Sequence, residues 1–136
     1  MKLDFDVVVI GAGIAGMTAA IYLKRANVNV VMIENNAPGG QINRTSSIEN
    51  YPGFNKIEGP TLAYNTFMQT QELGILYKYG NVVSIIPKKD YKEVKTEKEV
   101  IKCKYVIIAT GRKPRELGLK NETRLISKGV SLCAIC

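Results

Sequence analysis

Two cysteines near the end of the chain could carry redox chemistry. Cys133 and Cys136 are separated by Ala-Ile, which is the spacing of a redox dithiol. A thiolate is the nucleophile in disulfide exchange, and the second thiol of such a pair can release the first from a mixed disulfide. In a cytosolic chain this spacing predicts a catalytic pair rather than a structural staple. Cys103 stands alone in a strand-like segment, and we expect it to be a small packing residue rather than a reactive thiol.

A glycine turn near the beginning of the chain could hold phosphates. The apolar run Val7–Ile10 leads into Gly11-Ala12-Gly13-Ile14-Ala15-Gly16. Gly11 would allow a sharp turn, Gly13 the close approach of a pyrophosphate, and Gly16 close packing of a helix whose N-terminus binds the phosphates. Glu34 ends the next apolar run, at about the 20-residue spacing at which a carboxylate meets ribose hydroxyls. The alternative is a glycine turn that serves packing alone.

The elements around this turn predict an α/β fold. The expected strands are 7–10, 28–33, 75–79, 82–86, 91–95, 99–102 and 105–109, and the expected helices are 14–26 and 61–73. Residues 91–102 alternate apolar or β-forming residues with charges, as a half-exposed antiparallel meander does. The run Tyr105–Ala109 leads into Thr110-Gly111, which predicts a buried parallel strand that brings a small turn to the same crevice. We therefore predict a Rossmann-like, three-layer fold made of a parallel sheet, helices and a small antiparallel meander.

Two connections are predicted to be loops. Asn35–Gly40 concentrates turn-forming residues, and Gln41–Pro52 is a long polar stretch. Loops of that length in compact domains are usually functional or disordered. Gly39 and Gly40 would permit close approach to a ligand, while a plain loop is the alternative. Residues 112–123 are charged and loop-like.

Composition restricts the class of protein. With 136 residues, 46% hydrophobic and 23% charged, the chain has room for one ordinary globular domain and too little for a two-domain enzyme. No apolar run approaches the roughly 18 residues that cross a bilayer. A signal peptide is not visible before Val7, so we expect a cytoplasmic protein without membrane association.

Charge and the lack of histidine narrow the chemistry. The net charge is +7, but eight lysines between Lys78 and Lys104 are interleaved with acidic residues. This pattern predicts a solvated β-surface rather than a nucleic-acid interface. Because the chain has no histidine, His-based metal sites and Ser-His or Cys-His catalysis are excluded.

Taken together, the motifs resemble those of the low-molecular-weight thioredoxin reductases. The motifs are the glycine turn at 11–16, Gly39-Gly40-Gln41, Ile48-Glu49-Asn50-Tyr51-Pro52-Gly53, Ala109-Thr110-Gly111 and Cys133-Ala134-Ile135-Cys136. Their order and spacing cover the whole chain. The Cys-Ala-Xaa-Cys motif, placed about 20 residues after Ala-Thr-Gly, does most to distinguish this family from other flavoproteins that bind two dinucleotides.

The resemblance implies that the cofactor at the glycine turn is FAD. Gly11, Gly13 and Gly16 would meet its pyrophosphate, Glu34 its ribose, Gly40, Gln41 and Asn50 its flavin side, Val83 its adenine through the backbone, and Ala109, Thr110 and Gly111 its middle. The implied reaction passes electrons from NADPH through FAD and the dithiol to thioredoxin, within a homodimer. Cys136 would face the flavin, and Cys133 would attack the partner disulfide.

The sequence departs from this family in stopping at Cys136. In the family a pyridine-nucleotide domain follows, and the chain then returns to complete the FAD domain. The resemblance therefore implies an incomplete fold, with residues 1–115 as the first segment of the FAD domain. Residues 116–136 would be a linker and the start of the second domain. We expect the isolated chain to be inactive.

Two other functions are considered. One is a flavin- or dinucleotide-binding module without turnover of its own. The other is a related flavoprotein such as a ferredoxin–NADP reductase, which is disfavoured because that group resembles this chain without the dithiol.

Overall fold

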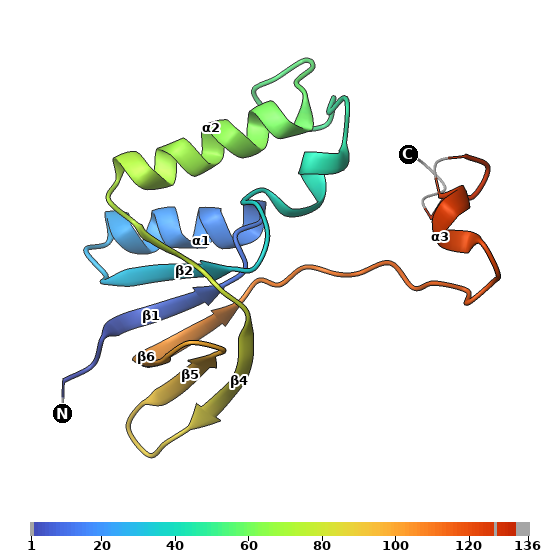
Figure 1. Cartoon of the computed structure of the whole chain (residues 1–136). Helices are drawn as coiled ribbons and strands as arrows, with labels where there is room; N and C mark the ends of the chain where they lie inside the picture. The colour runs from blue at the N-terminus through green and yellow to red at the C-terminus, as the bar shows by residue number, and fades with distance from the viewer. Residues whose placement is uncertain (1, 127, 133–136) are drawn as a thin grey trace.

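The fold is built on one six-stranded sheet in the order β3-β2-β1-β6-β5-β4 (Figure 1). The computed structural model describes residues 2–126 and 128–132. The strands are β1 (Phe5–Ile10), β2 (Val30–Glu34), β3 (Leu76–Tyr79), β4 (Val82–Pro87), β5 (Lys92–Thr96) and β6 (Val100–Ile108). The helices are α1 (Ile14–Arg25), the 3-10 helix η1 (Gly40–Arg44), α2 (Gly59–Glu72) and α3 (Glu122–Leu125). Strands β3, β2, β1 and β6 pair in parallel, whereas β6, β5 and β4 pair antiparallel.

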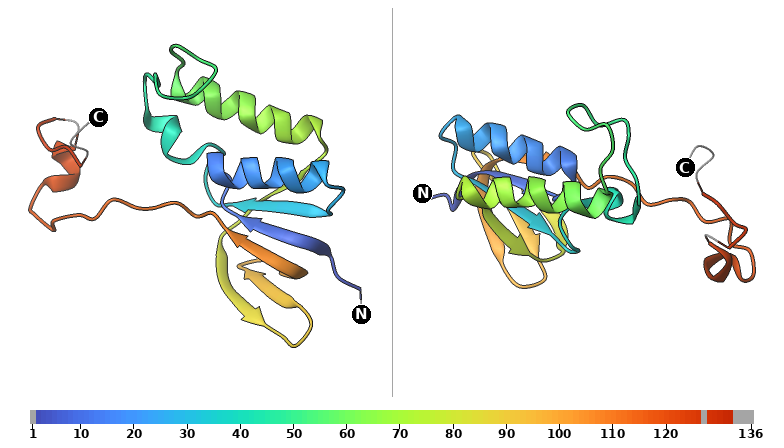
Figure 2. Two further views of the ribbon diagram at one scale, coloured as in Figure 1. Left: turned by 180° about the vertical axis from the view of Figure 1, so that it is seen from behind. Right: turned by 90° about the horizontal axis from the view of Figure 1, so that it is seen from above.

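Strands β1 and β2 are apolar from Val7 to Ile10 and from Val30 to Ile33 because both of their faces are covered. In the second part of β6, by contrast, Tyr105 and Ile108 are 56% and 67% exposed, so the expectation of a buried strand there was wrong. Val7 and Val9 of β1 pack with Met17 and Ala20 of α1, and α2 lies beside α1 over the same face (Figure 2). On the opposite face, Val8 and Ile10 pack with side chains of the meander, namely Val94, Ile101 and Cys103. The predicted three-layer Rossmann-like architecture is confirmed. The expectation that Cys103 is a packing residue is also confirmed, since its side chain is fully buried.

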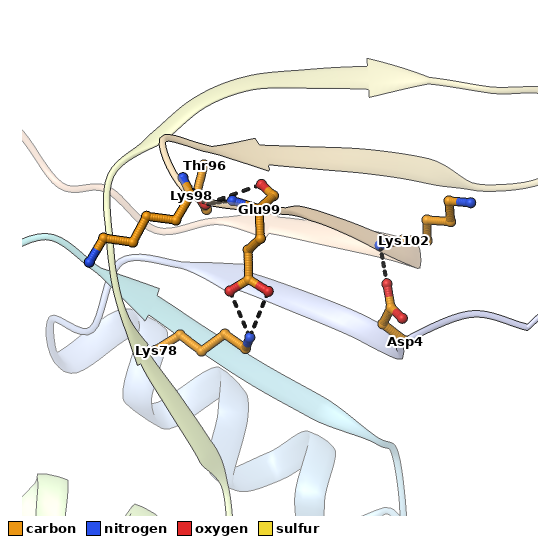
Figure 3. Close-up of polar contacts among 6 residues, drawn as sticks. All are labelled: Asp4, Lys78, Thr96, Lys98, Glu99 and Lys102. Atoms are coloured by element: carbon orange, nitrogen blue, oxygen red, sulfur yellow. Dashed lines mark hydrogen bonds and ion pairs between the residues drawn. The ribbon is translucent and has the colours of Figure 1, made fainter.

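The sheet curls because β3 and β4 lie at its two ends although only Gly80 and Asn81 separate them in sequence. An ion pair crosses this curl: Lys78 Nζ lies 2.7 Å and 2.9 Å from the two carboxylate oxygens of Glu99 (Figure 3). Thr96 Oγ1 accepts hydrogen bonds from the backbone N–H groups of Lys98 and Glu99, which fixes the β5–β6 turn. The ion pair therefore joins β3 to a well-defined hairpin.

Two expectations about secondary structure were wrong. The segments 99–102 and 105–109 form one strand, β6, whose first part pairs with β5 and whose second part pairs with β1. The change from alternating to continuous hydrophobicity marks a change of neighbour rather than a break. The long polar loop also contains η1, which begins at Gly40 because Gly39 adopts a left-handed backbone conformation with φ 118°.

After β6 the chain leaves the sheet as an extended segment and reaches α3 away from it (Figure 1). The carboxylate of Glu122 organises this region by accepting backbone hydrogen bonds from Leu117 (2.9 Å), Gly118 (2.9 Å) and Leu119 (3.2 Å). These bonds, that from Leu117 most of all, hold the pKa of Glu122 below its ordinary value. Within residues 2–126 and 128–132, no helix is long and apolar enough to cross a membrane.

We predict that acid opens this turn. Because the pKa of Glu122 is lowered, its stabilising contribution is complete above the ordinary glutamate pKa and is lost as the pH falls through the lowered value. Glu122→Gln should mimic the acid state at neutral pH, since one acceptor oxygen is replaced by a donor. Amide exchange of Leu117, Gly118 and Leu119 measures the opening, with the exposed Glu116→Gln as control. Unchanged protection in Glu122→Gln would contradict the prediction.

Candidate functional site

The glycine turn lies at the carboxyl edge of the parallel strands. Close backbone contacts require glycine at two of its positions. A Cβ atom at Gly11, where φ is 102°, would lie 2.3 Å from the carbonyl oxygen of Ala109. A Cβ atom at Gly16 would lie 2.0 Å from the carbonyl oxygen of Gly11. These two glycines therefore serve packing of the turn against β6 and of α1 against the turn.

Gly13 differs from both neighbours because the space in front of it is open. A Cβ atom there would meet nothing within 4 Å, and its φ of −74° is accessible to any residue. Gly13 is the N-cap of α1, no side chain caps this helix, and no acidic residue stands in its first turn. The N-terminal amides and the positive end of the helix dipole are thus available to an anion.

Glu34 connects the end of β2 to the glycine turn. One carboxylate oxygen accepts a hydrogen bond from the backbone N–H of Ala12 and the other from that of Asn36, both at 2.9 Å. The backbone carbonyl oxygen of Glu34 accepts another from Gly80 at 3.0 Å. Each carboxylate oxygen retains acceptor capacity for a further donor, such as a hydroxyl group.

The second glycine loop lies against the first. The backbone N–H of Gly39 donates to the carbonyl oxygen of Ala12 at 2.7 Å. A Cβ atom at Gly40 would lie 3.4 Å from Cα of Gly13. Gln41 Nε2 donates to the carbonyl oxygen of Arg112 at 3.3 Å. The two loops and the segment after β6 therefore meet at one edge of the sheet.

A cavity of about 190 Å³ opens at this edge. It is lined by Ile10, Gly11, Ile33, Glu34, Asn35, Gly80, Asn81, Val82 and Thr110. Thr110 is brought there because the N–H of Ala109 bonds to the carbonyl oxygen of Ile10 at 2.8 Å, and Gly111 follows with φ 67°. Sequence reasoning missed Asn35, Gly80, Asn81 and Val82, although a Gly-Asn pair between two short strands was a visible signal for a turn.

The remaining expected site residues do not line this cavity or lie outside the described residues. Val83 lies beside the cavity-lining Val82, at a bulge in the β4–β5 pairing, and is 52% exposed. Asn50 is exposed in the loop that the backbone pairing of Ile48 with Ile57 closes. Cys133 and Cys136 lie outside the described residues.

Comparison with known proteins identifies the family. The family model described as pyridine nucleotide-disulphide oxidoreductase matches residues 5–135. This chain belongs to the pyridine nucleotide-disulphide oxidoreductases. The matched range includes the glycine turn, Glu34 and the small turn after β6.

Several relatives of this chain are thioredoxin reductases. The chain is 46% identical over 132 residues to the thioredoxin reductase of Bacillus subtilis, covering 97% of this chain and 42% of the relative. The solved thioredoxin reductase of Lactococcus lactis superimposes with a TM-score of 0.87 at 43% identity, over 98% of this chain and 44% of that one. The structure from Streptococcus pyogenes gives 0.87 at 48% identity, over 97% and 43%.

These comparisons confirm the resemblance to thioredoxin reductases that the motifs predicted. They also set its extent, because the chain spans about two-fifths of the length of the curated relatives it matches.

We predict that the glycines of the turn differ in what they tolerate. Gly16→Ala should lower the free energy of unfolding by about 1 to 3 kcal/mol, since its Cβ would clash with backbone that cannot move aside. Gly13→Ala should lower it by less, about 0.5 to 1 kcal/mol, because its Cβ atom would meet no other atom and the only loss is that alanine is a poorer N-cap than glycine. Urea unfolding followed by far-ultraviolet circular dichroism compares them. Equal losses would show that the turn relaxes around Gly16.

Proposed function

We propose that this oxidoreductase chain is the FAD-binding part of a thioredoxin-disulfide reductase. The observation that carries the proposal is the open space at Gly13, in front of an uncapped α1 and facing Gly40. The similarity to thioredoxin reductases supports the choice of cofactor and acceptor. In the complete enzyme, electrons would pass from NADPH through FAD and the dithiol to thioredoxin.

The residues at this edge fit FAD. The pyrophosphate would lie against Gly13 and the first amides of α1, with Gly11 and Gly16 holding the turn in place. Glu34 would bind the ribose, which its spare acceptor capacity allows. Gly40, Gln41 and Asn50 would contact the flavin side, Val83 the adenine through its backbone, and Ala109, Thr110 and Gly111 the middle of the molecule. When bound, FAD accepts a hydride and passes two electrons to a disulfide.

The chain's own thiols divide between packing and exchange. Burial raises the pKa of the Cys103 thiol, so little of it is thiolate at neutral pH. We assign disulfide exchange to the other pair: by the resemblance to thioredoxin reductases, Cys136 would face the flavin and Cys133 would attack the disulfide of thioredoxin. We further propose that residues 1–115 are the first segment of the FAD domain and 116–136 a linker into the second domain. The complete protein would be a cytoplasmic homodimer.

We predict that Gly13→Val abolishes or severely weakens FAD binding without unfolding the chain. The introduced side chain would fill the space where the pyrophosphate must lie, while the fold leaves that space empty of its own atoms. Titration of the purified chain with FAD, followed by flavin fluorescence and the visible spectrum, measures binding. Thr18→Val, at an exposed position further along α1, is the control and should bind FAD as the wild type does. If Gly13→Val bound FAD as tightly as the wild type, the proposal of a dinucleotide site at Gly13 would be wrong.

We also predict that the isolated 136-residue chain binds FAD without NADPH-dependent turnover. Hydride transfer needs a nicotinamide held against the flavin, and such positioning supplies several kcal/mol of the barrier reduction. The chain corresponds to only about two-fifths of the relatives' length, and the site that fits a dinucleotide is assigned here to FAD. An NADPH-consumption assay with thioredoxin or an aromatic disulfide as acceptor tests this. Turnover comparable to that of a full-length reductase would place the NADPH site within these residues.

A further inference from the structure

The short connection between β3 and β4 forms one wall of the cavity at the sheet edge. Gly80 and Asn81 line the cavity of about 190 Å³ together with Gly11 and Glu34. They also line a smaller adjoining cavity of about 100 Å³, which is bounded by Tyr79 and by the β5–β6 turn. Asn81 thus lines both cavities.

Hydrogen bonds on both sides hold the Asn81 carboxamide. Asn35 Nδ2 donates to Asn81 Oδ1 at 3.4 Å, and Asn81 Nδ2 donates to Glu97 Oε1 at 3.3 Å. Asn36 Nδ2 donates in turn to Asn35 Oδ1 at 2.8 Å. These side chains form a continuous chain of hydrogen bonds from the loop after Glu34 to the β5–β6 turn.

Two further contacts fix the ends of this chain of hydrogen bonds. The Lys78–Glu99 ion pair holds the β5–β6 turn, which carries Glu97, against β3. The bond from the N–H of Gly80 to the carbonyl oxygen of Glu34 holds the connection at the end of β2. The position of Asn81 therefore depends on Glu97 on one side and on the Glu34 loop on the other.

We propose that Asn81 is a positioning residue for the adenine end of the bound dinucleotide. The inference rests on the proposed function, in which the pyrophosphate lies at Gly13 and the ribose at Glu34. A base attached to that ribose would occupy the part of the cavity that Asn81 and Val82 line. Held between Asn35 and Glu97, Asn81 keeps this wall at a fixed place before the ligand arrives, which lowers the ordering cost of binding.

The test exchanges the partners of one hydrogen bond. Asn81→Asp keeps the acceptor that faces Asn35 but sets a carboxylate against Glu97, so the Kd values for FAD and for ADP should both rise about fivefold to tenfold. Adding Glu97→Gln restores a donor opposite the new carboxylate, and both Kd values should return to within about twofold of the wild type. Asn65→Ala, at an exposed position of α2, is the control and should change neither value.

The outcomes separate this inference from the function on which it rests. FAD is titrated by fluorescence and ADP by its competition with FAD, and the thermal midpoint of each variant is recorded. A parallel loss for the two ligands, reversed in the double variant, supports the positioning role. Wild-type Kd values in Asn81→Asp, or no recovery in the double variant, would overturn the inference alone. A wild-type chain that binds neither FAD nor ADP would overturn the proposed function and this inference with it.

Discussion

The site depends on how closely α1 approaches the end of β1. Helix α1 can begin at Ile14, directly after the turn, because Gly16 has no side chain that would clash with the carbonyl oxygen of Gly11. That approach places the first amides of α1 at the carboxyl edge of the parallel sheet, where Gly40 and Thr110 also arrive. Without it, Gly13 would face no open space beside the neighbouring loops, and the remaining residues of the site would have no common edge to line.

Glu34 maintains this edge by bonding to the glycine turn, to the β3–β4 connection and to its own loop. Its carboxylate accepts from Ala12 and Asn36, and its backbone carbonyl accepts from Gly80. The carboxylate thus joins the glycine turn to its own loop while leaving acceptor capacity for a hydroxyl group. Glu34 contacts the glycine turn at Ala12, and the first turn of α1 itself contains no acidic residue to compete with a bound anion.

The sequence allowed the local parts of this arrangement to be predicted. The glycine turn, the continuous hydrophobicity of β1 and β2, and the role of Cys103 follow from residue types and spacing. The curl of the sheet does not, because Gly80-Asn81 reads as a tight turn between neighbouring strands. The two strands that this pair connects, β3 and β4, in fact lie at opposite ends of the sheet, because β6 pairs with β5 along its first part and with β1 along its second. The contribution of Asn81 to the cavity follows from that pairing and was missed for the same reason.

The physical cause of the curl is hydrophobic burial rather than charge. The face of β1 and β2 that α1 does not cover presents Val8, Ile10, Val31 and Ile33. Burying each such side chain stabilises the fold by about 1.5 to 3 kcal/mol, whereas an exposed ion pair of the Lys78–Glu99 type contributes about 0 to 1 kcal/mol. Apolar packing therefore brings the meander over this face. The ion pair adds a contact between β3 and the β5–β6 turn. The same packing brings Glu97 within hydrogen-bonding distance of Asn81. Burial of the apolar face of β1 and β2 therefore also determines where the Asn81 wall of the cavity lies.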